Sequence, residues 1–147
     1  MKHPRGFTII ELMIALSIAA VLATLAFMGY SDALAKSNFR ATRDVAAKLA
    51  LAQQQHRQQF GRYASAVQGS GTGNSTTLVL NDANDYAITV QSATYRDFAA
   101  TVTPTTRSLQ GTDTCWSVWV RSQQGFLTFG SQNKQQQDSR TECMPNG

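Results

Sequence analysis

Glu11 is the residue whose type and position raise the first chemical question in this sequence. It is the one acid in an apolar stretch from Gly6 to Tyr30, and the run from Leu12 to Tyr30 carries no charge. That run is close to the roughly 20 residues that span a bilayer as a helix. An acid deep in such a helix costs about 2.5–3.5 kcal/mol on insertion scales, and a charge in an apolar packed core is tolerated only when paired. The chemistry that fits Glu11 is therefore an ion pair with an amine.

The two cysteines offer the second kind of chemistry. Cys115 and Cys143 are the only cysteines of the 147-residue chain, and the histidines His3 and His56 lie far from them in the sequence. A zinc site would need about four ligands. Behind an export segment, two distant cysteines indicate a disulfide. In the chain-entropy model, the loop of about 29 residues that it closes would contribute about 3–4 kcal/mol.

No pattern in the sequence indicates catalysis. There is no Ser-His-Asp set, no phosphate-binding glycine loop and no metal-ligand cluster, so we expect no enzyme activity, no cofactor and no metal. The net charge is +4, but Lys2 and Arg5 precede the apolar run and account for part of the excess. The charge balance therefore says little about nucleic acid.

Three interpretations of the N-terminal segment compete. A secretory signal peptide would be cut after residues 33–35, Ala-Leu-Ala, but its apolar region normally has 7–15 residues and no acid. A plain membrane anchor leaves the cost of Glu11 unexplained. In the third interpretation the chain is cut between Gly6 and Phe7, and Glu11 pairs with the new amine of Phe7 on a neighbouring subunit. We favour the third because it accounts for the acid.

The residues that carry this interpretation also resemble a known family. The sequence Arg5-Gly6-Phe7-Thr8-Ile9-Ile10-Glu11-Leu12-Met13-Ile14 is similar to the class III signal of type IV pilins and the related pseudopilins. The resemblance implies that a prepilin peptidase cuts after Gly6 and N-methylates Phe7, with Glu11 as the subunit-assembly acid. Many relatives have a proline late in the apolar segment. Here Gly29 is the only obvious position at which the helix could loosen, since glycine costs about 1 kcal/mol of stability in a helix interior.

The resemblance also implies the fold and the division of the chain. The type IV pilin fold is α+β, with a long N-terminal helix packed on a roughly four-stranded antiparallel sheet and a disulfide-bounded C-terminal loop. We expect a prepilin leader over 1–6, a hydrophobic transmembrane or filament-core helix over 7–30 and an amphipathic helix over 31–63. Residues 64–147 would hold the αβ-loop, the sheet and the C-terminal region bounded by Cys115 and Cys143.

The helical pattern continues past the apolar run and is expected to end near Gly61. One stripe recurs at steps of three or four: Leu34, Asn38, Ala41, Val45, Leu49, Ala52, His56, Phe60 and Tyr63. With the apolar run this makes a helix of about 55 residues, about 85 Å long. We expect His56 to be satisfied at the core edge and the glutamines of 53–59 to lie on the surface.

Three cations follow the apolar run at helical spacing on the face away from this stripe. They are Lys36, Arg40 and Arg43. We expect a solvated or headgroup-contacting face, with inter-subunit ion pairing or a small contribution to DNA binding as the alternatives. Three cations without interleaved aromatic residues do not make a nucleic-acid site.

Four strand patterns follow, over 86–91, 98–102, 115–120 and 126–129, the last after a hairpin turn at 123–125. They predict an antiparallel meander whose apolar face covers the helix stripe. In the third run, alternation predicts that Trp116, Val118 and Val120 face the helix. Cys115, Ser117 and Trp119 would face outward, and Trp119 would be either covered by the C-terminal loop, which we favour, or exposed as a contact.

The resemblance implies a structural subunit of a type IV pilus, most like minor pilins of the PilE class. It would wait in the inner membrane with its soluble domain in the periplasm, then join an extracellular pilus for adhesion, twitching motility or DNA uptake. Its partners would be other pilin subunits through the N-terminal helix, prepilin peptidase and the inner-membrane assembly platform, with DNA or a surface receptor left open as further partners.

Three alternatives stay open. One is the major pilin of the filament. Another is a DNA-receptor pilin with a basic surface built from Arg96, Arg107, Arg121 and Arg140. The third is a type II secretion pseudopilin. Major pseudopilins commonly have a calcium-binding loop where this chain has its two cysteines, which favours a pilin.

Overall fold

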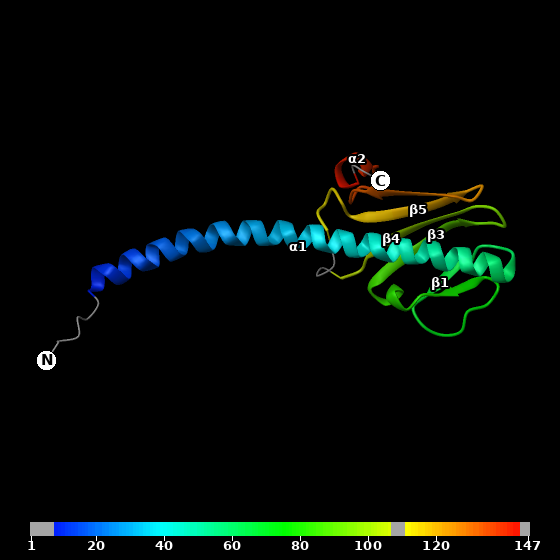
Figure 1. Cartoon of the computed structure of the whole chain (residues 1–147), viewed down its shortest axis with the longest axis horizontal. Helices are drawn as coiled ribbons and strands as arrows, with labels where there is room; N and C mark the ends of the chain where they lie inside the picture. Colours follow the sequence, from blue (N-terminus) through cyan, green and yellow to red (C-terminus); the bar gives the residue numbers. More distant parts are fainter. Residues whose placement is uncertain (1–7, 107–110, 145–147) are drawn as a thin grey trace. The chain divides into compact units, whose positions relative to one another are not determined.

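The first described element is one long helix, as the sequence predicts. The computed structural model describes residues 8–106 and 111–144, apart from the side chains of 26–29 and 82–83. Its helix α1 spans Ile9–Phe60 and is continuous through Gly29 (Figure 1). The chain forms two compact units, residues 1–34 and 35–147, and α1 runs through both.

The end of α1 lies where the sequence predicts. Gly61 follows the last helical residue with a φ of +73°, a left-handed conformation that glycine adopts without a Cβ clash. Its N–H donates to the carbonyl oxygen of Arg57 at 2.8 Å. This turn brings the following residues back beside the last turns of the helix.

The predicted four-stranded antiparallel meander is confirmed. Its strands are β3 (Tyr86–Ala93), β4 (Phe98–Pro104), β5 (Ser117–Gln123) and β6 (Phe126–Gln132), in the order β3-β4-β5-β6. The predicted turn joins β5 to β6: Gln123 pairs with Phe126, and Gln124 and Gly125 between them have φ of 51° and 89°. Two consecutive positive φ values are typical of a two-residue hairpin turn.

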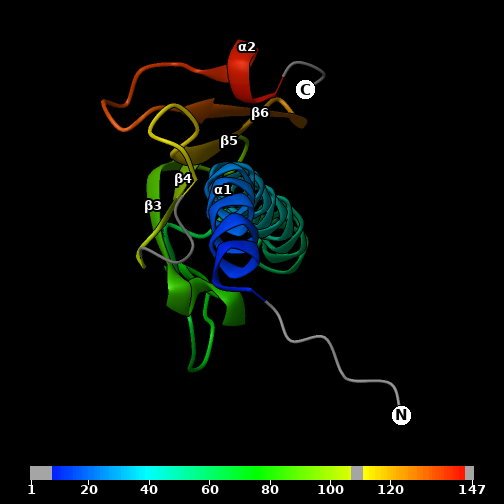
Figure 2. The same ribbon diagram turned by 90° about the vertical axis from the view of Figure 1, so that its left-hand side faces the viewer.

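Four short elements were not predicted. A parallel pair, β1 (Ala66–Gln68) and β2 (Thr77–Val79), lies between α1 and the sheet in the sequence and is followed by a 3-10 helix, η1 (Asn81–Asp85). The four-residue helix α2 (Arg140–Cys143) lies near the end of the chain, on the side of the sheet where β6 is (Figure 2). Segments of three to five residues are too short to show a periodic pattern.

The core lies between the second half of α1 and one face of the sheet (Figures 1 and 2). On the helix, the buried positions step through Phe39, Thr42, Val45, Ala46, Leu49, Ala50, Gln53 and His56. The sheet contributes alternate residues of its central strands: Phe98, Ala100, Val102, Val118 and Val120. The predicted stripe is therefore correct at Val45, Leu49 and His56. Leu34 and Phe60, toward its two ends, are 46% and 39% exposed, whereas its last member, Tyr63, is buried beyond the end of the helix.

The alternating pattern predicted for residues 115–120 is wrong at its first two residues, just before β5. Val118 and Val120 face the helix as predicted, and Trp119 is covered, with 9% of its surface exposed. Trp116, however, lines a groove together with Ser117 and Trp119, while Cys115 packs against the core. The reason is that β5 begins at Ser117, so the strand period does not apply to the two residues before it.

Gln53 is buried, contrary to the prediction for the glutamines of this helix. Its side chain has no exposed surface, and its amide forms two hydrogen bonds with the backbone of Ala64. The Ala64 N–H donates to Gln53 Oε1 at 2.8 Å, and Gln53 Nε2 donates to the Ala64 carbonyl at 3.0 Å. The amide thus satisfies both backbone groups of a buried residue after the Gly61 turn.

Replacing Gln53 with leucine is expected to lower the free energy of unfolding by about 2 kcal/mol, because two buried backbone groups of Ala64 lose their partners. Urea unfolding of the full chain in detergent micelles, followed by tryptophan fluorescence, measures this loss. The matched control is Gln55→Leu, an exposed neighbour whose replacement should change stability by less than about 0.5 kcal/mol. Equal midpoints for the two variants would contradict the role of the Gln53 amide.

Candidate functional site

The carboxylate of Glu11 has a partner within its own chain. Thr8 precedes the first helical residue, and its N–H lies 3.5 Å from Glu11 Oε2 as donor, while the Glu11 N–H donates to Thr8 Oγ1 at 3.3 Å. This reciprocal pair is a capping box, in which two free N–H groups of the first helical turn are satisfied. Both contacts are long and exposed, so the carboxylate is held loosely at the positive end of the helix dipole.

Glu11 was predicted to act in assembly alone, and its contact with Thr8 was not predicted. The signal was present, because a threonine followed three residues later by glutamate before an apolar run is the sequence pattern of a capping box. The predicted cleavage and methylation residues, Gly6 and Phe7, lie outside the described residues. Thr8 is therefore a further functional residue of the predicted assembly segment, and it was found only from the structure.

The apolar half of α1 exposes its side chains. The large apolar residues between Ile9 and Leu25 are 55–81% exposed, and this is the one described helix that is long and apolar enough to cross a membrane. Its hydroxyls bond inside the helix: Ser17 Oγ donates to the Met13 carbonyl at 2.8 Å, and Thr24 Oγ1 to Val21 at 2.7 Å. Polar groups satisfied in this way are compatible with hydrocarbon surroundings.

The predicted cationic face of α1 is exposed. Lys36, Arg40 and Arg43 line a groove of about 310 Å³ together with the disulfide. Glu142 also lines this groove, so the face is not purely cationic.

His56 is satisfied within the protein, as predicted. It is 5% exposed, and both ring nitrogens face backbone carbonyl oxygens: Nδ1 lies 2.9 Å from Arg62 O and Nε2 lies 2.8 Å from Asn74 O. A neutral imidazole has one N–H and donates to only one of these carbonyls. Through these contacts His56 ties the segment after α1 to the helix.

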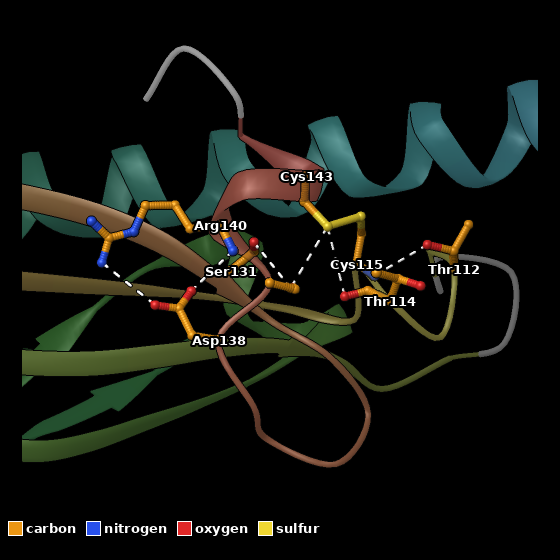
Figure 3. Close-up of a disulfide and its surroundings, with 8 residues drawn as sticks. Thr112, Thr114, Cys115, Ser131, Asp138, Arg140 and Cys143 are labelled. Atoms are coloured by element: carbon orange, nitrogen blue, oxygen red, sulfur yellow. Dashed lines mark hydrogen bonds and ion pairs between the residues drawn. A yellow bond between two sulfur atoms is a disulfide. The ribbon is translucent and has the colours of Figure 1, made fainter.

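The disulfide predicted between Cys115 and Cys143 is confirmed. Their Cα atoms are 5.7 Å apart, and the bond joins the segment before β5 to α2 (Figure 3). The Cys115 N–H donates to Thr112 Oγ1 at 3.1 Å, and Cys143 Sγ lies 3.6 Å from the Thr114 carbonyl oxygen. Residues 112–115 are thereby held against the C-terminal segment.

The four arginines of the DNA-receptor alternative do not form one described surface. Arg121 and Arg140 meet at Trp119, with guanidinium carbons 4.8 and 5.0 Å from its ring centroid. Arg140 also lies 3.7 Å from a carboxylate oxygen of Asp138 (Figure 3). Arg96 lies in the exposed turn between β3 and β4, and Arg107 lies outside the described residues.

Comparison with known families agrees with the N-terminal pattern. A family model described as the prokaryotic N-terminal methylation motif matches residues 1–27. No curated protein matches the chain. The motif supports a pilin-like or pseudopilin-like subunit, a structural protein rather than an enzyme, and implies processing by prepilin peptidase and assembly with other pilin subunits. The apolar helix that follows is consistent with membrane anchoring before assembly. The chain therefore carries, at residues 1–27, the N-terminal methylation signal of type IV prepilins.

Proposed function

We propose that the chain is a minor subunit of a type IV pilus used for adhesion, twitching motility or DNA uptake. The observation that carries the proposal is the methylation signal at residues 1–27 at the head of a continuous 52-residue helix. The second half of that helix carries an α+β domain, and this layout supports the same role. The first half of α1 is left free to serve as membrane anchor and then as filament core.

In this proposal the protein first waits in the inner membrane, with residues 35–147 in the periplasm. Prepilin peptidase removes the leader, residues 1–6, and N-methylates Phe7. The subunit then leaves the bilayer through the assembly platform, and Glu11 pairs with the Phe7 amine of a neighbouring subunit. The loose hydrogen bonds of the capping box leave the carboxylate able to accept this partner.

The C-terminal region favours a pilus over a secretion pseudopilus. The Cys115–Cys143 disulfide closes the segment that in major pseudopilins commonly forms a calcium-binding loop. The assignment as minor rather than major subunit follows the sequence resemblance and concerns copy number, which an abundance measurement tests.

Mass spectrometry of filaments sheared from the cell surface tests the proposal. We expect a chain that begins with N-methylated Phe7, at trace abundance relative to the main filament protein. A dominant signal would make this chain the major subunit. A chain that begins at Lys36, or its absence from the filament fraction, would overturn the pilus assignment.

A further inference from the structure

A groove of about 480 Å³ lies on the face of the sheet that points away from α1. Its floor comes from the outward-facing residues of β3, β4 and β5, and its wall comes from the segment after β6. Thr89, Thr101, Trp119 and Gly130 form one row across the four strands. The volume is within the range of small-ligand sites, about 300–1,000 Å³.

Two tryptophan–cation pairs shape this groove. Arg121 lies 4.8 Å from the ring centroid of Trp119, and the Lys134 Nζ lies 5.1 Å from that of Trp116. Trp119 is fixed against Gly130, where an added Cβ would clash with the indole. Both pairs are within the range of cation–π attraction, so the two cations are positioned at the groove by the aromatic rings.

The charge of the groove is positive. Arg121 and Lys134 line it, and no acidic side chain is among its described lining residues. Lys134 Nζ lies 3.7 Å from a carboxylate oxygen of Asp113, but the two side chains are 56% and 80% exposed, and such surface pairs are weak. An anionic ligand would therefore find two cations without a strong competing acid.

The other lining groups are mostly neutral amides and hydroxyls, including Gln91, Gln132 and Gln136. Amides and hydroxyls both donate and accept hydrogen bonds, which suits ligand hydroxyls. A phosphate backbone needs only donors. Base stacking needs an open aromatic face, but Trp119 is 9% exposed, with two guanidinium groups against its ring. The Trp116 ring has the Lys134 ammonium 5.1 Å from its centroid.

We propose that this groove binds an acidic saccharide, a sugar that carries a carboxylate. Arg121 and Lys134 hold the carboxylate, the amides and hydroxyls bind the sugar hydroxyls, and Trp116 supplies an apolar wall. The inference rests on the proposed function only for access: in a filament with α1 at its centre, this face looks outward. Binding itself is a property of a single chain.

The test uses the full chain in detergent micelles, without filaments, so its result does not depend on the pilus assignment. The chain has two tryptophans, and both line the groove, so intrinsic fluorescence reports on this site directly. The probe is a trimer of galacturonic acid, and its fully methyl-esterified form is the neutral control. We expect a saturable fluorescence change with the acid and at least about tenfold weaker binding of the ester.

Variants separate the site from general charge attraction. Arg121→Gln is expected to weaken binding by about tenfold or more, and Lys134→Gln, an exposed loop change, should also weaken it. Arg96→Gln makes the same charge change outside the groove and should leave the affinity unchanged. Calorimetric titration of each variant gives the affinity independently of any change in tryptophan environment.

Several results would overturn the proposal. One is the absence of a saturable response to the acid, and another is equal binding of the acid and its ester. Equal effects of Arg96→Gln and Arg121→Gln would indicate unspecific attraction. Tighter, Arg121-dependent binding of a thymidine oligonucleotide would assign the groove to nucleic acid instead, and the same result with a polyglutamate peptide would assign it to an acidic protein segment.

Discussion

Replacing Glu11 with glutamine is expected to reduce the abundance of this protein in sheared filaments by about 100-fold or more. Glutamine also serves in a capping box, so the variant keeps the local hydrogen bonds with Thr8 and loses only the charge. In the filament core that we propose, the Phe7 amine of the neighbouring subunit would then be left without its acid. Removing one partner of a buried ion pair costs about 3–5 kcal/mol, which corresponds to a factor of more than 100.

Thr8→Ala is the matched variant, because it removes the cap and keeps the charge. Loss of a threonine cap costs about 1 kcal/mol of helix stability, so we expect filament abundance to fall by a few-fold at most. Mass spectrometry of membranes and filaments measures two quantities for each variant: N-methylated Phe7 and the filament share. Processing should be unchanged in both variants.

The opposite pattern would contradict assembly pairing. If Glu11→Gln filaments kept their wild-type content while Thr8→Ala filaments lost theirs, the function of Glu11 would be to cap the helix. Loss of N-methylated Phe7 in Glu11→Gln would instead place the effect at the peptidase. The pair of variants therefore separates the three roles that a carboxylate at this position can have.

Local signals in the sequence predicted much of the fold. Gly61 marks the end of α1, and Gln124-Gly125 marks the β5–β6 turn, because both glycines supply positive φ values that other residues adopt at a cost. The length of α1 followed from the uninterrupted helical pattern. The four main strands followed from short alternating runs between turn residues, and the disulfide from two cysteines behind an export segment.

The failures occurred where a distant contact decides the outcome. Gln53 has a side chain that favours the surface, but its partner Ala64 is reached only after the Gly61 turn, a geometry that helix periodicity does not contain. Cys115 packs inward because its bond to Cys143 and the contacts of residues 112–114 fix an irregular segment before β5. Alternation along the sequence predicts which face of the sheet a side chain lies on only for residues that are in a strand, and Cys115 is not in one.

The residues around the groove also divide into those that a local pattern places and one that only distant contacts place. The sequence identified Arg121, Arg140 and Trp119 but gave no basis for placing Arg140 beside the other two. Arg121 and Trp119 are two residues apart on the same strand, and strand alternation alone puts them on one face. Arg140 reaches that ring through the path of the chain after β6, which is set by the isolated pairing of Gln132 with Asp138 and by the disulfide.

Replacing both Cys115 and Cys143 with serine is expected to lower the free energy of unfolding by about 3–4 kcal/mol. The two cysteines are 28 residues apart, and in the chain-entropy model the bond restricts the unfolded chain by that amount. Urea unfolding in micelles, with and without dithiothreitol, measures the effect. The reductant should shift the wild-type midpoint to that of the variant and leave the variant unchanged, whereas coincident midpoints for oxidised and reduced wild type would contradict the prediction.

In the native state, removing the disulfide should loosen mainly the C-terminal helix α2. The bond anchors this helix, which is too short to be stable alone. The helix α2 has four residues, and isolated helices of this length do not form in water. Without the disulfide it keeps the buried Met144 and the hydrogen bond from the Ser139 N–H to the Ser131 carbonyl at 3.0 Å. Hydrogen exchange should therefore become faster for the α2 amides, including the Glu142 N–H, while the amides of β5, paired on both sides, stay protected. If β5 and α2 instead gained exchange equally, the disulfide would stabilise the sheet as a whole rather than its C-terminal cover.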